Sequence, residues 1–174
     1  MDVITTHINA DFDCLGAMIA AKKLYPDAAM VFPGAQERNL REFFLRSTVY
    51  AYDFKRIKDI DLDQVKRLIL VDVCQQERIG PFDEVAARDD VEIHVYDHHP
   101  VDSSLNPALS VVEQVGATVT VFSHIFMENG IRPTPDEATL MMLGLYEDTG
   151  SLLFNSNTEK DFAAASFLLS CGGN

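Results

Sequence analysis

The most constraining feature of this chain is a continuous apolar run, Leu68-Ile69-Leu70-Val71, which ends directly at Asp72. A short apolar run without polar alternation is typical of a buried strand in a parallel sheet. Further strands are predicted over residues 3–6, 29–32 and 91–96. Because helical patterns separate these strands, the chain is predicted to have an α/β fold, with a mostly parallel sheet and helices on both faces.

The helical spacing of apolar residues recurs between and after these strands. It predicts helices over residues 14–24, 39–45, 82–88, 118–129, 135–146 and 158–170. Shorter strands are predicted over residues 49–54 and 109–112. The last three helices follow one another, so the α/β part should be followed by a helical segment. Thr158 and Asp161 form a variant of the capping box at the start of the final helix.

The charge of the chain limits the partners that it can bind. Its net charge is −13, which argues against a broad electrostatic surface for nucleic acid. A nucleotide ligand stays compatible with this charge, because bound cations would reverse the local field. No signal peptide and no membrane-spanning segment is predicted. The cysteines Cys14, Cys74 and Cys171 are interpreted as buried small side chains without disulfides, which favours a cytoplasmic location.

Acids and histidines follow the predicted strands. His7 comes just after the first strand, Asp72 ends the apolar run, and Asp97 follows the strand over residues 91–96. Because the carboxyl ends of parallel strands meet at one edge of a sheet, these side chains are expected to lie close together. Carboxylates together with imidazoles are the ligands that Mn²⁺, Fe²⁺ and Zn²⁺ bind in proteins. The pattern therefore predicts a metal site at this edge.

Several of these acids also have a structural interpretation. Asp11 or Asp13 could cap the first helix, but one acid would be enough for that role. Asp72 could pair with Arg78, and Asp148 could start a turn with Gly150. The metal interpretation is favoured because a carboxylate in an apolar strand is costly to bury unless it is paired or metal-bound.

The segment Asp97-His98-His99 is the sharpest of these signals. Neighbouring side chains in an extended chain point to opposite sides, so one histidine is interpreted as a metal ligand and the other as facing the substrate. Asp97 could fix the tautomer of one imidazole. Two metals that share a carboxylate would clamp the attacking and leaving oxygens of a phosphate reaction.

The ordered set of motifs resembles the DHH phosphoesterase superfamily, which includes RecJ-like exonucleases, oligoribonucleases and family II inorganic pyrophosphatases. The resemblance covers nearly the whole chain. The matching stretches are His7-Ile8-Asn9-Ala10-Asp11-Phe12-Asp13 with Gly16, Val71-Asp72-Val73, Asp97-His98-His99, Gly116-Ala117-Thr118 and Asp148-Thr149-Gly150-Ser151. Where the family often has serine, this chain has Cys14 and Ala17.

The resemblance implies two divalent metal ions, Mn²⁺ first, with Mg²⁺, Co²⁺ or Zn²⁺ as alternatives. The implied ligands are His7 and Asp11 for one ion, Asp13, His98 and Asp148 for the other, and Asp72 as the bridge. The implied catalytic residues are His99, which would face the substrate phosphate, and Asp72. The implied supporting or substrate-contacting residues are Asn9, Asp97, Gly116 and Thr118, the last two at a helix start that could lend amides to phosphate.

The expected function is hydrolysis of phosphodiester or phosphomonoester bonds in nucleotides or short oligonucleotides, as in a nuclease. A manganese-dependent inorganic pyrophosphatase is one alternative. A nucleotide-sensing or accessory module of a larger RNA-processing protein is another. The family's second domain, which closes over the substrate, is absent from residues 1–174. The chain is therefore expected to be a fragment linked to downstream domains, and weakly active by itself.

Overall fold

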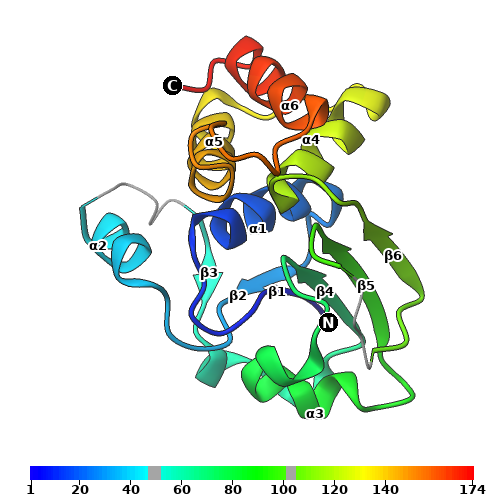
Figure 1. Ribbon diagram of the computed structural model, residues 1–174. Coiled ribbons are helices and arrows are strands. Elements are labelled where there is room, and N and C mark those ends of the chain that lie inside the picture. Colours follow the sequence, from blue (N-terminus) through cyan, green and yellow to red (C-terminus); the bar gives the residue numbers. More distant parts are fainter. Residues whose placement is uncertain (47–51, 101–104) are drawn as a thin grey trace.

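The computed structural model describes residues 1–46, 52–100 and 105–174, and these form an α/β fold (Figure 1). Its sheet has six parallel strands in the order β3-β2-β1-β4-β5-β6. The strands are β1 (Asp2–Thr5), β2 (Ala29–Val31), β3 (Phe54–Lys55), β4 (Arg67–Val71), β5 (Glu92–Asp97) and β6 (Leu109–Val112). The predicted fold class is confirmed.

The order of the strands creates a switch point between β1 and β4. From β1 the chain moves outward through β2 to β3, and it then returns to β4 and moves the opposite way. Thr5 of β1 lies beside Leu70 of β4, and Val71 lies beside Tyr96 of β5. The carboxyl ends of these strands therefore meet, and ligands of open parallel sheets bind outside such a point.

Helices cover both faces of the sheet unequally. The helices are α1 (Phe12–Leu24), α2 (Arg38–Arg46), α3 (Asp83–Ala86), α4 (Thr118–Asn129), α5 (Pro135–Asp148) and α6 (Glu159–Ser170). One face carries α1, with α4, α5 and α6 gathered around it, whereas α3 lies on the other face (Figure 1). Short 3₁₀ turns accompany α3 there, at Ile57–Asp59, Leu62–Gln64, Gln76–Arg78 and Gly80–Phe82. The helical segment predicted after the sheet is thus the layer over α1.

A close contact between α1 and α5 fixes one wall of the switch point. A Cβ atom added to Gly144 of α5 would lie 2.7 Å from both the Cα atom of Asp13 and the carbonyl oxygen of Phe12. Only glycine allows the backbones to approach this closely. The last turn of α5, which carries Asp148, is therefore held against the first turn of α1, which carries Asp13.

Some predicted boundaries differ from the structure. The crossover helix predicted over residues 82–88 is wrong as one element, because a 3₁₀ turn at Gly80–Phe82 precedes a short helix that ends at Ala86. Gly80 has a φ of +58°, so the chain turns sharply before Pro81. Part of the strand predicted over residues 49–54 lies outside the described residues. Helix α5 runs two residues past its predicted end, which places Asp148 in its last turn.

The predicted capping box at Thr158 and Asp161 is confirmed. Asp161 is fully buried, and its Oδ1 atom also accepts hydrogen bonds from the amide of Gly116, at 2.9 Å, and the hydroxyl of Thr120, at 2.6 Å. This carboxylate therefore ties the start of α6 to the start of α4. In the described parts of the chain, no helix has the length and apolar character that crossing a membrane requires.

Candidate metal centre

Asp72 is the centre of the candidate site. It follows β4, its side chain is buried, and its φ of +56° lies in the left-handed region that non-glycine residues seldom adopt. Its amide donates a hydrogen bond of 2.9 Å to the carbonyl oxygen of Tyr96, which holds the turn. Strained backbone of this kind costs about 1–3 kcal/mol and clusters at functional sites. The Asp72 carboxylate lies 3.4 Å from Nε2 of His7, 3.5 Å from Nε2 of His98 and 3.8 Å from Nδ1 of His99.

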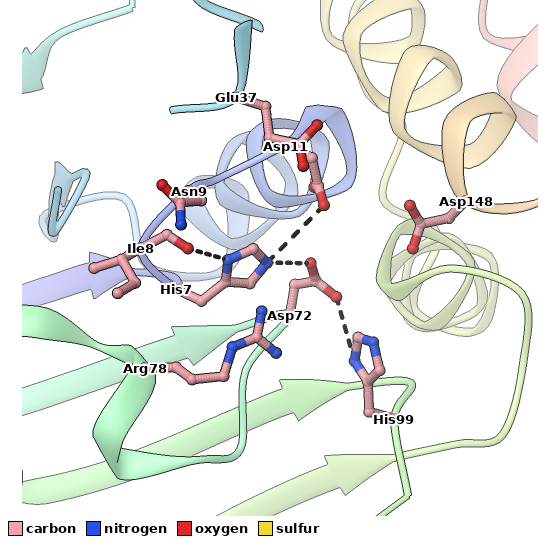
Figure 2. A pocket seen from close by; sticks show the side chains of 9 residues that line it. All are labelled: His7, Ile8, Asn9, Asp11, Glu37, Asp72, Arg78, His99 and Asp148. Atoms are coloured by element: carbon pink, nitrogen blue, oxygen red, sulfur yellow. Dashed lines mark hydrogen bonds and ion pairs between the residues drawn. The ribbon is translucent and has the colours of Figure 1, made fainter. Parts of the chain in front are cut away.

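His7 approaches Asp72 from the loop after β1. Its Nε2 atom lies 3.4 Å from Oδ2 of Asp72 and 3.9 Å from Oδ2 of Asp11 (Figure 2). Its Nδ1 atom donates to the carbonyl oxygen of Ile8 at 2.7 Å, so Nε2 faces the acids. Burial lowers the pKa of His7, but the hydrogen bond with Asp72 and the nearby charge outweigh it and raise that pKa.

His98 approaches Asp72 from the other side. Its Nε2 atom lies 3.5 Å from Oδ1 of Asp72 and 3.3 Å from Oδ2 of Asp148, and its Nδ1 atom donates to the carbonyl oxygen of Val115 at 3.0 Å. Burial lowers its pKa, but the interaction with Asp148 and the charges of Asp13 and Asp72 raise it to about 10. Both histidines thus use Nδ1 on a carbonyl and aim Nε2 at the carboxylates, which is how histidine ligands are commonly oriented.

Asp11, just before α1, and Asp13, in its first turn, also accept backbone amides at helix starts. Oδ1 of Asp11 accepts from the amide of Cys14 at 3.0 Å, so the capping interpretation is correct for this atom, while Oδ2 faces His7. Both oxygens of Asp13 accept amides of α4, from Thr118 at 2.6 Å and from Val119 at 3.0 Å. The two acids therefore have structural roles in addition to any metal.

The unliganded arrangement is electrostatically unfavourable. Burial, and then the charge of Asp72, raise the pKa of Asp11. The same two causes raise the pKa of Asp13 well above its ordinary value. In addition, Nε2 of His98 is buried between Asp72 and Asp148, at 3.5 and 3.3 Å, without a well-aligned hydrogen bond to either carboxylate. Repelling acids around a buried imidazole nitrogen are what a bound cation would relieve.

The donor atoms in the described residues form four groups, of which three share Asp72 and the fourth is Asp11, Glu147 and Asp148. One group is His7, Asp11, Cys14 and Asp72, a second is Asp13, Asp72, His98 and Asp148, and a third is Asp72, Asp97, His98 and His99. Within each group the candidate ligand atoms lie within 4.8 Å of one another. Carboxylate with imidazole suits divalent transition metals, and a shared carboxylate suits a pair of them. The residues therefore fit divalent metal ions.

The two adjacent histidines do not point to opposite sides, so that expectation is wrong. Their ring centres lie 4.1 Å apart, and Nδ1 of His99 lies 3.8 Å from Oδ1 of Asp72. The cause is Asp97, whose Oδ1 atom accepts the amides of His98 at 2.8 Å and His99 at 3.2 Å and lies 2.8 Å from Nδ1 of His99. These bonds bend the chain directly after β5. His98 is largely buried, whereas the side chain of His99 is 45% exposed.

The structure places Gly116 and Thr118 differently from the expectation. The amide of Gly116 donates to Asp161, and that of Thr118 donates to Asp13, so neither is free to contact phosphate. The hydroxyl of Thr118 donates to Oδ1 of Asp72 at 2.9 Å. Thr118 therefore supports two of the predicted ligands, while Gly116 contacts a structural carboxylate.

A pocket of about 350 Å³ opens over these side chains (Figure 2). Its lining residues are His7, Ile8, Asn9, Asp11, Glu37, Asp72, Arg78, His99 and Asp148. Asn9, with a φ of +60°, also lines the pocket. Glu37 was not predicted. It directly precedes α2, and the sequence around it contains no motif that indicates a ligand site. Arg78 adds a permanent positive charge to an acidic wall.

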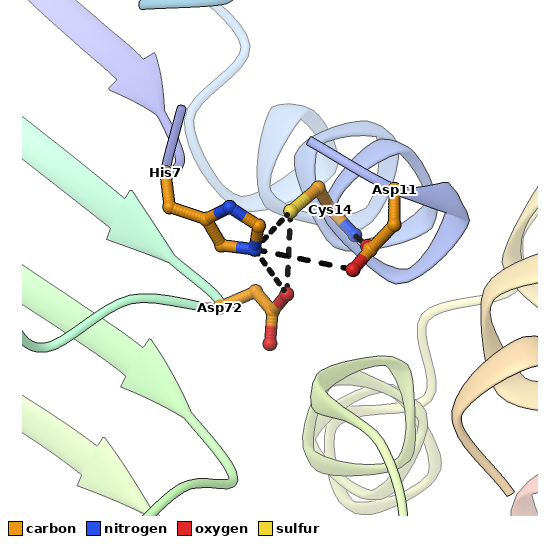
Figure 3. Close-up of side chains that lie close together, drawn as sticks. All are labelled: His7, Asp11, Cys14 and Asp72. Carbon is orange, nitrogen blue, oxygen red and sulfur yellow. Dashed lines mark hydrogen bonds and ion pairs between the residues drawn. The ribbon is translucent and has the colours of Figure 1, made fainter. Parts of the chain in front are cut away.

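Cys14 is another residue of the site that the sequence interpretation missed. It is buried as expected, but its sulfur faces the polar side: it donates to Oδ2 of Asp72 at 3.2 Å and lies 3.1 Å from Nε2 of His7 (Figure 3). Burial and the charges of Asp72 and Asp11 raise the pKa of this thiol well above its ordinary value. Cys74 is buried, whereas Cys171 is only partly buried, which corrects the expectation for that residue.

Comparisons with known proteins agree with the fold and the motifs. The family model described as "DHH family, N-terminal domain" matches residues 3–145. An A-adding tRNA nucleotidyltransferase from Geobacter sulfurreducens is 55% identical over 175 residues, which cover 100% of this chain and 20% of that protein. A Thermotoga maritima protein named as a probable manganese-dependent inorganic pyrophosphatase is 31% identical over 112 residues, or 63% of this chain and 20% of that protein.

A solved structure shows the same fold. The crystal structure of an exopolyphosphatase-related protein from Bacteroides fragilis superposes with a TM-score of 0.81 at 18% identity, over 99% of this chain and 53% of that chain. The chain spans only 20% of the length of the two relatives above. The match over most of its length, with His7, Asp72 and His98 converging at one sheet edge, leads to one conclusion. The chain belongs to the DHH family, as a copy of its N-terminal domain.

Proposed function

We propose that this chain is the two-metal phosphoesterase domain of a longer protein, and that it hydrolyses phosphoester bonds of nucleotides or short oligonucleotides. The observation that carries the proposal is the convergence on Asp72 of two groups of candidate ligands, one from the β1–α1 turn and one from β5 and α5. Isolated surface acids would have no reason to surround two imidazole nitrogens in this way.

The proposed ligands divide between two positions. His7 and Asp11 would hold one ion, Asp13, His98 and Asp148 would hold the other, and Asp72 would belong to both. When bound, such a pair of divalent ions, Mn²⁺ first among them, polarises phosphate and neutralises developing charge. Thr118 fixes the shared carboxylate by donating its hydroxyl to Oδ1 of Asp72.

Two further side chains are assigned to the substrate. His99 lines the pocket with a half-exposed ring, and Oδ1 of Asp97, 2.8 Å from its Nδ1 atom, fixes its orientation. It can donate a hydrogen bond to a phosphate oxygen. Arg78 lines the same pocket, and a guanidinium binds phosphate through paired hydrogen bonds.

The pocket favours a small phosphoester. Its volume of about 350 Å³ lies at the low end of the range for ligand sites. A nucleotide or the end of a short strand suits this size, and the net charge of −13 offers no extended track for a longer one. Positioning contributes several kcal/mol to catalysis, and this chain would depend on other parts of the protein for much of it. We therefore expect slow turnover from the chain alone.

A second candidate function is favoured by the relative from Geobacter sulfurreducens. That protein is named as an A-adding tRNA nucleotidyltransferase, and this chain matches 20% of it at 55% identity. The chain could accordingly serve as an accessory or nucleotide-sensing module of an RNA-processing protein, with metals bound but little hydrolysis. The pyrophosphatase alternative is favoured by the relative from Thermotoga maritima.

One substrate panel separates these functions. The chelator-treated chain would be assayed with Mn²⁺ on bis-p-nitrophenyl phosphate, a dinucleotide and inorganic pyrophosphate. We expect slow cleavage of the activated ester, weaker cleavage of the dinucleotide and none of pyrophosphate. Asp72→Asn should reduce the rate by about 100-fold or more, because metal ions contribute several kcal/mol and each 1.36 kcal/mol is tenfold.

The control variant is Asp136→Asn, which changes an exposed acid in the first turn of α5. It should keep the wild-type rate. Preferential cleavage of pyrophosphate would support the pyrophosphatase. Tight metal and nucleotide binding without any hydrolysis would support the accessory module and contradict the phosphoesterase.

A further inference from the structure

Cys14 is part of the buried core, but its sulfur lies at the edge of that core among the donors of one candidate metal position. Figure 3 shows it between His7, Asp11 and Asp72. Its distances are 3.1 Å to Nε2 of His7 and 3.2 Å to Oδ2 of Asp72, and those two atoms are 3.4 Å apart. Three different donor types therefore face one another across a short gap.

These separations are close to those of ligands around one ion. Zinc binds sulfur at about 2.3 Å, and nitrogen or oxygen at about 2.0–2.2 Å, so tetrahedral donors stand roughly 3.3–3.6 Å apart. The separation of Nε2 of His7 and Oδ2 of Asp72, 3.4 Å, lies within this range, and the two sulfur separations, 3.1 and 3.2 Å, are slightly shorter. Asp11 completes the group, with Oδ2 3.9 Å from Nε2 of His7. Small shifts of these side chains would place all four donors on one metal.

The hydroxyl of Thr6 gives an independent indication. It donates a hydrogen bond of 2.9 Å to the Cys14 sulfur, and both residues are fully buried. A donor aimed at sulfur adds nothing to apolar packing, but it stabilises a sulfur that carries negative charge. Outer partners of this kind orient and tune metal ligands.

We infer that Cys14 is a metal ligand, and that it makes the position formed with His7, Asp11 and Asp72 selective for zinc-like ions over Mn²⁺. The inference rests on the proposed function, since it presupposes a metal centre at Asp72. Thiolate sulfur selects softer ions such as Zn²⁺, whereas carboxylates favour harder ions such as Mn²⁺. On binding, the metal–sulfur bond replaces the thiol S–H bond, and the proton leaves to solvent.

The two metal positions then differ in chemistry. The position formed by Asp13, Asp72, His98 and Asp148 has only oxygen and nitrogen donors, so it keeps its compatibility with Mn²⁺. The position that contains Cys14 takes the softer ion. The chain would accordingly carry a mixed pair of metals, with Zn²⁺ beside α1 and Mn²⁺ beside α5.

Cobalt is the probe for the first test, because Co²⁺ bound to thiolate gives a sulfur-to-metal absorption band in the near ultraviolet. The chelator-treated wild-type chain would be titrated with Co²⁺. We expect this band to develop with one of the two equivalents bound. Cys14→Ser should abolish it while binding two equivalents, and Cys171→Ser, which alters a partly buried residue after α6, should keep it.

Metal competition is the second test. In Cys14→Ser, the zinc affinity of the position formed with His7, Asp11 and Asp72 should fall roughly ten- to hundredfold. Loss of a residue that only hydrogen-bonds to a metal ligand costs about this much, and loss of a ligand should cost at least as much. Its affinity for Mn²⁺ should stay within about threefold of the wild-type value, because oxygen replaces sulfur without harm to a hard ion. An equal loss for both ions would indicate a packing role and overturn the inference.

The outcomes separate this inference from the proposed function. Wild-type chain that binds two Co²⁺ ions without a sulfur band would overturn the role of Cys14 and leave the two-metal proposal standing. A band that survives in Cys14→Ser would also overturn it, since another cysteine would be the source. Wild-type chain that binds no Co²⁺ would overturn both. If Cys14→Ser failed to fold by circular dichroism, the wild-type titration alone would still decide.

Discussion

Nε2 of His98 lies 3.3 Å from Oδ2 of Asp148, and this pair joins the sheet to the helical layer. His98 follows β5, whereas Asp148 ends α5. Their approach depends on the close contact of α5 with α1 at Gly144. The candidate metal centre is therefore coupled to the packing of helices that carry only some of its proposed ligands.

Gly144→Ala should damage both stability and metal binding. The added methyl group would meet backbone atoms of Phe12 and Asp13 at 2.7 Å, so α5 must move. Overpacking of this kind costs about 1–3 kcal/mol, to be measured by urea unfolding, and metal content should fall with it. Gly34→Ala is the matched control, because its methyl group would meet only the exposed Ile8 side chain. Equal stability of the two variants would contradict the packing argument.

Asp161→Asn should destabilise the chain by roughly 1–3 kcal/mol. Each carboxylate oxygen accepts two hydrogen bonds, and an amide nitrogen cannot accept those on its side, so buried donors would lose their partner. Glu137→Gln is the control, since Glu137 closes the same kind of capping box on α5 at a more exposed position. It should lose about 1 kcal/mol or less. A larger loss in Glu137→Gln would refute the structural role given to Asp161.

The sequence predicted the sheet and its polar edge because both depend on local patterns. The apolar run before Asp72 indicates a buried strand. Because Asp72 is the next residue, it must lie at the carboxyl end of that strand. The helix over residues 82–88 was wrong because apolar spacing does not reveal the 3₁₀ turn that Gly80 starts. The composition of this segment suited a helix, but the positive φ of Gly80 starts a 3₁₀ turn before it.

The contacts of the site depended on tertiary structure that no local pattern encodes. The sequence marked Asp97, yet the turn that brings His98 and His99 together arises from hydrogen bonds to its side chain. Cys14 looked like a small core residue on a helix. Its sulfur lies 3.1 Å from Nε2 of His7 because the segment between β1 and α1 brings His7 to the first turn of α1. The His98–His99 contact and the position of the Cys14 sulfur both depend on the three-dimensional course of the loops after β1 and β5.

Divalent metal should stabilise the chelator-treated chain. A ligand that binds only the folded state, at a hundredfold excess over its Kd, adds about 2.7 kcal/mol and raises the melting temperature. Mn²⁺ should have this effect because its charge offsets the burial and the repulsion from Asp72 that raise the pKa values of Asp11 and Asp13. Differential scanning fluorimetry measures the shift, and Asp72→Ala should lose most of it. A melting temperature unchanged by Mn²⁺, Co²⁺ and Zn²⁺ would contradict the metal centre.

The metal content of two purified variants, measured by elemental analysis after chelation and reloading, tests the central claim most directly. Asp72 belongs to both proposed positions, whereas Asp148 belongs to one of them. The wild-type chain should retain two ions, Asp148→Ala should retain one, and Asp72→Ala should retain fewer than Asp148→Ala. Two ions retained by Asp72→Ala would contradict the account.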